Sequence, residues 1–343
     1  HILGSDHPHT LTSRNNLAHA YRSAGRLGQA IPLFERSLDD REHILGSDHP
    51  HTLTSRNNLA HAYRSAGRLG QAIPLFERSL DDREHILGSD HPHTLTSRNN
   101  LANAYRSAGR LGQAIDLHER SLDDREHILG PDHPHTLTSR NDLAHAYQSA
   151  GRLKEAVPLF ERNLAEALRI LGSDHPDILA SRNNLANAYW SAGRLDQAID
   201  LRKKNLAEAL RILGPDHPHT LTFRNNLAFA YQSAGRLKEA VPLFEQILAD
   251  RERVLGPDHP DILASRGNLA DAYWSAGRLD QAIDLYEQNL AEALRVLGPD
   301  HSHTRLFRGN LAAAYRAVGR DEDAAALLDP PSDPDDTDAE TPT

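Results

Sequence analysis

The sequence predicts an all-α fold, a solenoid of about eight helix-turn-helix units that repeat every 42 residues. Residues 1–42 and 43–84 are identical, and residues 85–126 differ from them at only three positions. A hairpin of this size cannot bury its apolar face alone, so we expect the units to stack around one continuous core. The glycine that marks each unit stands at Gly4, Gly46, Gly88, Gly130, Gly172, Gly214, Gly256 and Gly298.

Two helices are expected in each unit. In the first unit, the first helix should span about residues 9–24, with Asp6 as its N-cap and Gly25 ending it. The second helix should span about residues 27–45, roughly 28 Å at 1.5 Å per residue. Apolar residues fall on one face of each helix. They are Leu11, Leu17, Ala18, Tyr21 and Ala24 in the first and Leu27, Ala30, Ile31, Phe34, Leu38 and Leu45 in the second.

The solenoid should span residues 1–328, with units beginning near residues 1, 43, 85, 127, 169, 211, 253 and 295. Residues 329–343 carry six acids, no base and several prolines, a composition typical of a disordered tail. The chain begins at His1 and contains no methionine, so we expect it to belong to a longer protein whose native start lies upstream. A signal peptide, if present, would precede these residues.

Composition excludes several classes of protein. There is no cysteine, and therefore no disulfide and no thiolate metal site. No apolar run approaches the 18 residues of a membrane span. The net charge is −10, so a strongly basic nucleic-acid-binding protein is not expected. We therefore expect a cytoplasmic protein with no nucleic-acid partner and no membrane partner.

Catalytic residues should depart from the repeat, because an enzyme needs one site and not eight. The chain contains neither a GxxxxGK[ST] phosphate loop nor an HExxH zinc motif. Ser5, Asp6 and His7 are neighbours in one loop, and four units replace that serine with proline, so turn formation explains them better than catalysis. The 22 histidines follow repeat positions and suggest no mixed ligand set. We predict no enzymatic activity, no cofactor and no metal site.

The repeated signature LAxAYxxAGRLxxA resembles the tetratricopeptide repeat, and the 42-residue unit with NNLA and LGPDHP resembles its kinesin-light-chain type. The resemblance covers residues 1–328. It departs from the family at Arg14, where a tryptophan-type residue is usual. It departs also at the position of Ser37, where several later units replace the usual small residue with asparagine or isoleucine. The resemblance implies a right-handed superhelix whose first helices line a concave face that holds peptides or partner proteins.

Asparagine recurs on the polar face of the first helix in six units. An asparagine amide can both donate to and accept from a peptide backbone, and asparagine is a mediocre helix former. One asparagine per unit would therefore hold an extended chain whatever its sequence. These residues are Asn15, Asn57, Asn99, Asn141, Asn183 and Asn225; glycine replaces them at Gly267 and Gly309.

Variable side chains flank this asparagine series. The first three units place arginine there, suited to carboxylates, and later units place aromatic residues, suited to an apolar anchor. An invariant frame beside a variable stripe is typical of a binding surface, although drift on a solvated surface would produce variation too. The candidate ligand-binding residues on the stripe are Arg22, Arg64, Arg106, His19, His61, His145, Trp190, Phe229 and Trp274.

These patterns predict a non-enzymatic scaffold or sensor arm of a larger bacterial protein, which binds a protein or peptide with acidic residues and a hydrophobic anchor. The alternative is self-assembly. Nearly identical units could stack end to end between chains, and the array would then be a homo-oligomeric spacer with no dedicated peptide ligand.

Overall fold

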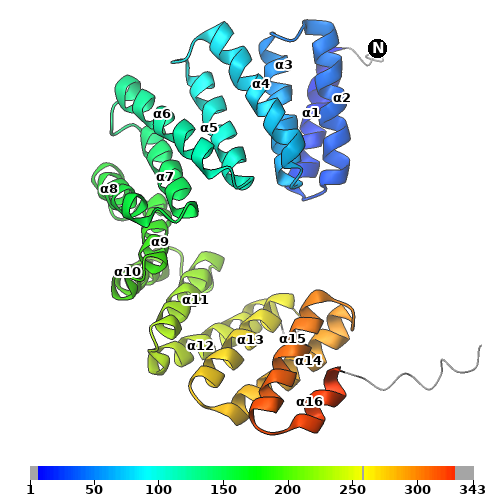
Figure 1. Cartoon of the computed structure of the whole chain (residues 1–343), viewed down its shortest axis with the longest axis vertical. Coiled ribbons are helices and arrows are strands. Elements are labelled where there is room, and N and C mark those ends of the chain that lie inside the picture. The colour runs from blue at the N-terminus through cyan, green and yellow to red at the C-terminus, as the bar shows by residue number, and fades with distance from the viewer. Residues whose placement is uncertain (1–6, 257–258, 329–343) are drawn as a thin grey trace, which may run out of the picture. The chain divides into compact units, whose positions relative to one another are not determined.

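A computed structural model describes residues 7–256 and 259–328, and within these ranges the chain forms α-helices and no strand (Figure 1). The expected disordered tail at 329–343 lies outside the described residues. The helices are α1 Pro8–Ser23, α2 Leu27–Leu45, α3 Pro50–Ser65, α4 Leu69–Leu87, α5 Pro92–Ser107, α6 Leu111–Leu129, α7 Pro134–Ser149, α8 Leu153–Leu171, α9 Pro176–Ser191, α10 Leu195–Ile212, α11 Pro218–Ser233, α12 Leu237–Leu255, α13 Pro260–Ser275, α14 Leu279–Leu297, α15 Ser302–Ala317 and α16 Asp321–Leu328.

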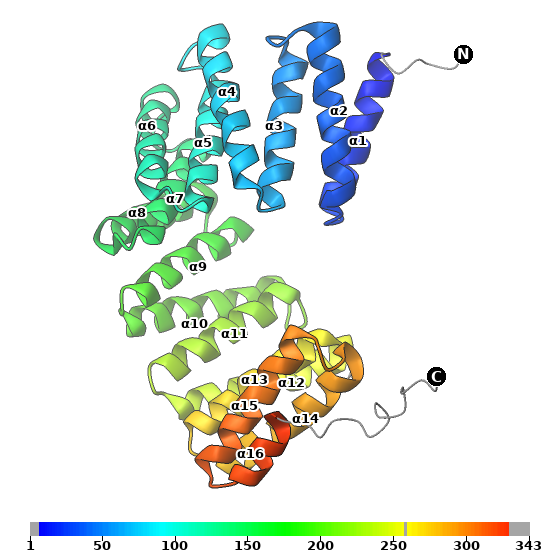
Figure 2. The same cartoon turned by 45° about the vertical axis from the view of Figure 1, so that its right-hand side comes forward.

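The chain divides into two compact units, His1–Ala188 and Tyr189–Thr343, with the division inside α9. In the first unit, each helix from α1 to α8 packs against the next helix along the chain. In the second unit, α10 to α16 pack in the same consecutive way, and Figure 2 shows these hairpins from a second direction. The prediction of an all-α helical-hairpin repeat is therefore confirmed.

Helix boundaries agree closely with the sequence expectation, but the predicted N-cap is wrong. The second helix of the first repeat spans Leu27–Leu45 as expected, and the first begins one residue early. Its N-cap is His7, whose Nδ1 accepts a hydrogen bond from the His9 backbone N–H at 3.2 Å. In the next repeat, His49 caps α3 in the same way, while Asp48 accepts from the hydroxyl of Ser47. Histidine therefore fills the capping role that we assigned to aspartate.

Each hairpin turn is fixed by a glycine and an arginine. Gly25 has a φ of +71°, in the left-handed region that other residues rarely adopt. This conformation lets the Arg26 N–H donate to the Tyr21 carbonyl at 2.8 Å, which closes the end of α1. The Arg26 guanidinium then lies 4.9 Å from the centre of the Tyr21 ring. The same pair recurs in every hairpin, which explains an arginine that all eight units share.

A buried arginine joins three helices at each repeat that retains its partners. Arg56 of α3 is fully buried, and it donates to Glu42 of α2 at 2.7 Å and to Asp82 of α4. Arg140 makes the equivalent pairs with Glu126 and Glu166. Since these bonds cross from one hairpin to the next, they set the register between repeats as well as within them.

A tyrosine makes a second bond between hairpins. Tyr63 of α3 donates its hydroxyl hydrogen to Glu35 of α2, and burial together with this bond raises the pKa of Tyr63 to about 12. Tyr105 bonds Glu77 in the same way at 2.6 Å. Glu35 and Glu77 accordingly lie half-buried between repeats.

We expect Arg56→Met to lower the free energy of unfolding by about 2–3 kcal/mol, since two charge-assisted bonds are lost while the carboxylates, still partly exposed, can rehydrate. Arg78→Met is the matched control, because the Arg78 side chain is 56% exposed and its ion pair with Asp82 is long, at 4.0 Å. This variant should change the free energy of unfolding by less than about 0.5 kcal/mol. Urea denaturation followed by circular dichroism measures both. Equal effects of the two variants would contradict the role assigned to Arg56.

Candidate functional site

The candidate site is the polar face of the first helices, here called the first-helix stripe, defined by the series of Asn15, His19 and Arg22 and their counterparts in later repeats. All six asparagines of the stripe are half-buried, and so are its three arginines and three histidines. Trp190 is 44% exposed, whereas Phe229 and Trp274 are half-buried against the core of the second unit. The stripe is described separately for each of the two compact units.

The asparagines of the stripe form a ladder from one hairpin to the next. The Oδ1 of Asn15 accepts from the amide of Asn58 at 3.2 Å, and the Oδ1 of Asn57 accepts from Asn100 at 3.1 Å. Asn141 accepts from Asn184 at 3.0 Å in the same way. Their carbonyl oxygens are thus used in packing between repeats, and the side-chain N–H groups of Asn15, Asn57 and Asn141 are the donors that these bonds leave available to a peptide carbonyl.

One rung of this ladder is reversed. The fourth unit has Asp142 where its neighbours have asparagine, and a carboxylate can only accept. Asn99 therefore donates its amide to Asp142 at 2.8 Å, and the Asn99 Oδ1 is buried without a hydrogen-bond partner. At this rung, the ladder therefore leaves an asparagine carbonyl oxygen unused, whereas at Asn15, Asn57 and Asn141 it leaves the side-chain N–H groups unused.

The three arginines of the stripe lie close enough to repel one another. Burial lowers the pKa of Arg64, and the charges of Arg106 and Arg22 lower it further. No ion pair within 4.0 Å is recorded for any of the three in the described part of the chain, and the Arg106 Nε is buried without a partner. Three like charges close to one another and outside any ion pair create a positive surface on α1, α3 and α5.

The histidines of the stripe cover buried phenylalanines. His19, His61 and His145 each meet the phenylalanine of the paired second helix edge-on, with ring centres 4.9–5.1 Å apart. Burial is the main reason that the pKa of His61 falls to about 4, with Arg64 adding to it. These imidazoles are therefore neutral at pH 7 and serve packing as well as forming part of the stripe.

In the second unit, the aromatic residues of the stripe lie in separate environments. The guanidinium of Arg202 lies 5.5 Å from the centre of the Trp190 ring. Phe229 packs edge-on against Phe244 at 5.2 Å. No ring contact between Trp190, Phe229 and Trp274 is recorded among the described residues, so each would meet a ligand by itself.

Trp274 borders a pocket of about 320 Å³ between α13, α14 and α15. Tyr286 donates its hydroxyl hydrogen to Asp271 at the pocket wall, and Asn310 and Ala313 form the other side. An aromatic ring beside a hydroxyl–carboxylate pair could receive an apolar side chain next to a hydrogen-bond donor.

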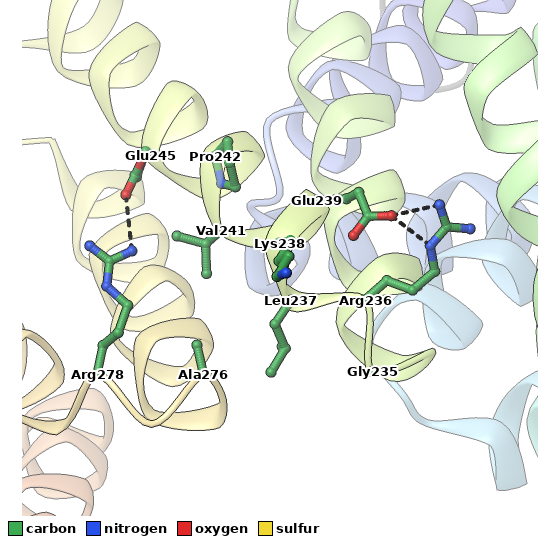
Figure 3. A pocket seen from close by; sticks show the side chains of 10 residues that line it. All are labelled: Gly235, Arg236, Leu237, Lys238, Glu239, Val241, Pro242, Glu245, Ala276 and Arg278. Carbon is green, nitrogen blue, oxygen red and sulfur yellow. Dashed lines mark hydrogen bonds and ion pairs between the residues drawn. The ribbon is translucent and has the colours of Figure 1, made fainter.

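A larger pocket of about 610 Å³ lies away from the stripe, at the start of α12 and the next hairpin turn (Figure 3). Four of its charged groups form two pairs: Arg236 bonds Glu239 at 2.7 Å, and Arg278 lies 3.7 Å from Glu245. We assign no ligand to it.

Among the residues that the structure describes, no group of three histidine, aspartate or glutamate side chains could hold a metal ion. None of the described helices combines the length and hydropathy needed to cross a membrane.

The tetratricopeptide repeat family matches the chain over residues 9–85, 52–127, 94–165, 141–204, 177–249, 220–291 and 275–329. The chain therefore belongs to the tetratricopeptide repeat family. A crystal structure from Podosopora anserina, of kinesin-light-chain repeats that are nearly identical to one another, is 35% identical with a TM-score of 0.54, covering 60% of this chain and 97% of that one. The resemblance to kinesin-light-chain-like repeats is thereby confirmed. A search of curated proteins found no match.

Two more distant structures share the fold alone. The apo quorum sensor NprR from B. thuringiensis is 15% identical with a TM-score of 0.62, covering 96% of this chain and 87% of that one. A signal transduction ATPase with a tetratricopeptide repeat sensor, from Pyrococcus horikoshii, is 14% identical with a TM-score of 0.62. That match covers 93% of this chain and 46% of the ATPase.

His118 predicts a pH-dependent stability. Its ring is fully buried on α6, neither ring nitrogen has a hydrogen-bond partner, and burial lowers its pKa well below that of an unfolded histidine. At a pH between these two values, His118 binds a proton in the unfolded chain but not in the folded chain. The contribution of His118 to folding stability is therefore complete above about pH 6.5 and is lost as the pH falls toward 4. Four other repeats carry phenylalanine at this position.

We expect His118→Phe to raise the free energy of unfolding at pH 5 by about 1–2 kcal/mol and to flatten its decline between pH 7 and 5. Urea denaturation at both pH values measures this. His127→Asn, at an exposed position of the same helix, is the control and should leave the pH dependence unchanged. Parallel pH curves for His118→Phe and the wild-type chain would refute the assignment.

Proposed function

We propose that the chain is a non-enzymatic scaffold or sensor arm of a larger cytoplasmic bacterial protein, and that it holds an extended segment with acidic residues and a hydrophobic anchor along its first-helix stripe. In this proposal, the arginines of the first unit bind carboxylates. The aromatic residues of the stripe in the second unit contact the hydrophobic anchor, and the asparagine N–H groups bind the segment's backbone.

The observation that carries this proposal is the arginine column of α1, α3 and α5. Arg22 and Arg106 both repel Arg64, and no ion pair relieves the three in the described residues. Placing like charges together opposes folding, and carboxylates supplied by a ligand would relieve the repulsion. The sensor roles named for NprR and for the Pyrococcus ATPase support a sensing role by analogy of fold.

A fluorescein-labelled peptide of glutamate residues flanking one phenylalanine tests the proposal by fluorescence anisotropy. We expect Arg22, Arg64 and Arg106 changed together to glutamine to weaken binding at least about tenfold and to reduce its salt dependence. The matched control changes Arg36, Arg78 and Arg120 to glutamine, which removes the same charge from the exposed face of the second helices in the same repeats.

Equal weakening by both triple variants would mean that net charge, and not the stripe, attracts the peptide. Undiminished binding by the stripe variant would refute the proposal. A peptide with glutamine in place of glutamate should bind weakly to every variant.

Self-association is the second candidate function, because residues 1–42 and 43–84 are identical, so one hairpin could stack on the same hairpin of another copy. Leu59 and Leu101 are buried where consecutive hairpins stack, and Leu17 is the residue at the same repeat position in α1. A hairpin of another copy stacked on α1 would cover Leu17 as the preceding hairpin covers its counterparts.

We expect Leu17→Glu to abolish any concentration-dependent mass, since a charge would then be buried in the stacked interface. Sedimentation velocity over about a hundredfold range of protein concentration measures it. Thr12→Glu, on an exposed position of the same helix, is the control. A wild-type chain that is monomeric throughout this range would exclude stacking as its function.

A further inference from the structure

Consecutive hairpins meet at a joint where one side chain of a second helix fills the space against the following first helix. In the first joint, Arg41 of α2 is buried and donates to the Ser55 hydroxyl of α3 at 2.7 Å and to the His51 backbone carbonyl at 3.2 Å. Arginine faces serine in four joints of the chain. The pairs are Arg41 with Ser55, Arg83 with Ser97, Arg125 with Ser139 and Arg251 with Ser265.

Two other joints are filled in the opposite way. Alanine replaces the arginine, and phenylalanine replaces the serine, at Ala209 with Phe223 and at Ala293 with Phe307. Phe307 is buried, and Phe223 packs against the core of the second unit. Each of these six joints therefore contains one large side chain, supplied either by the second helix or by the following first helix.

The joint between α8 and α9 has neither. It pairs Ala167 with Ser181, so both positions are small. A pocket of about 370 Å³ lies at this joint, and both residues line it. Leu137, on the pocket wall, is half-exposed, whereas its counterparts Leu53 and Leu95 in earlier repeats are buried. The pocket thus follows directly from the missing large side chain.

The pocket wall contributed by α9 is built to accept a guanidinium group. Residues 176–182 of α9 have the same sequence as residues 260–266 of α13. In α13, that sequence accepts Arg251 through the Ser265 hydroxyl at 2.6 Å and through the Asp261 backbone carbonyl at 3.4 Å. The corresponding acceptors in the pocket are the hydroxyl of Ser181 and the backbone carbonyl of Asp177.

Two further polar side chains of the pocket, those of Asn163 and Asp177, also favour a cation. Asn163 of α8 lines it and is only 6% exposed, and its Oδ1 is buried without a hydrogen-bond partner. The Asp177 side chain adds a carboxylate, and the lining includes no lysine or arginine. An unpaired buried acceptor is costly, and a charged donor would satisfy it.

We propose that the α7–α8–α9 pocket binds a guanidinium group, from either an arginine side chain of a partner or free arginine. The ligand's guanidinium takes the place that Arg251 fills in the α12–α13 joint. It donates to the Ser181 hydroxyl and the Asp177 carbonyl, and its stem lies against Leu137 and Ile170. An aromatic ring in the same place would cover these acceptors without supplying a donor. This proposal does not rest on the acidic-peptide function, whose arginines lie in other hairpins.

Isothermal titration calorimetry with Nα-acetyl-arginine-N-methylamide tests the proposal on the full chain. We expect saturable binding that weakens at least about tenfold in Ala167→Arg, since the chain's own arginine then fills the pocket. Ser181→Phe should weaken binding equally, because it reproduces the alanine–phenylalanine joint. Ala165→Arg, on the exposed face of α8, adds the same charge elsewhere and should bind as the wild type does.

Further probes decide between ligands. The citrulline analogue, which keeps the shape but not the charge, should bind at least about tenfold more weakly than the arginine probe. Tighter binding of the capped residue than of free L-arginine indicates a protein partner, and the reverse indicates a metabolite; both agree with the proposal.

Three results would overturn the proposal. They are no binding of the arginine probe to the wild-type chain, undiminished binding to both filled variants, and equal or tighter binding of Nα-acetyl-phenylalanine-N-methylamide. Circular dichroism shows whether each variant is folded, and either filled variant suffices if the other does not fold.

Discussion

The joint between consecutive hairpins is the constraint on which the rest of this structure depends. No hairpin buries its apolar face alone, so every repeat needs its neighbour in a fixed register. That register is held by bonds that cross the joint, such as those from Arg56 to Glu42 and from Tyr63 to Glu35. Because the helices pack in the same way at each joint, a substitution on one side leaves a gap or a clash unless the other side changes to match.

The same constraint explains why the first-helix stripe divides into constant and variable positions. Asparagines such as Asn15 and Asn57 bond the next hairpin and therefore contribute to the joint. The flanking positions differ between repeats. Arg64 repels its neighbours and so weakens the fold that displays it. This repulsion at a variable position is the physical basis of the binding surface proposed above.

The helices were predictable from sequence because their signals are local. A glycine such as Gly25, at positive φ, and apolar residues at helical spacing lie within a few residues of the boundary they specify. The candidate site was less predictable. The bond from Asn58 to Asn15 joins residues 43 positions apart, and the buried role of Glu35 depends on the next hairpin. His7 as N-cap was missed because histidine is not a preferred capping residue.

The joint between α8 and α9 shows how such a repeat can acquire a pocket without a new element. The second half of α8 has the sequence NLAEAL, which also occurs in α10 and α14, and the joints after α10 and α14 are filled by phenylalanine. The start of α9 has the sequence of the start of α13, and the joint before α13 is filled by arginine. Joining halves from two types of repeat leaves Ala167 opposite Ser181 and no side chain to fill the space between them. Such a gap lowers stability unless something occupies it. A repeat protein can therefore gain a ligand site by the order of its repeats, with every helix still in its ordinary place.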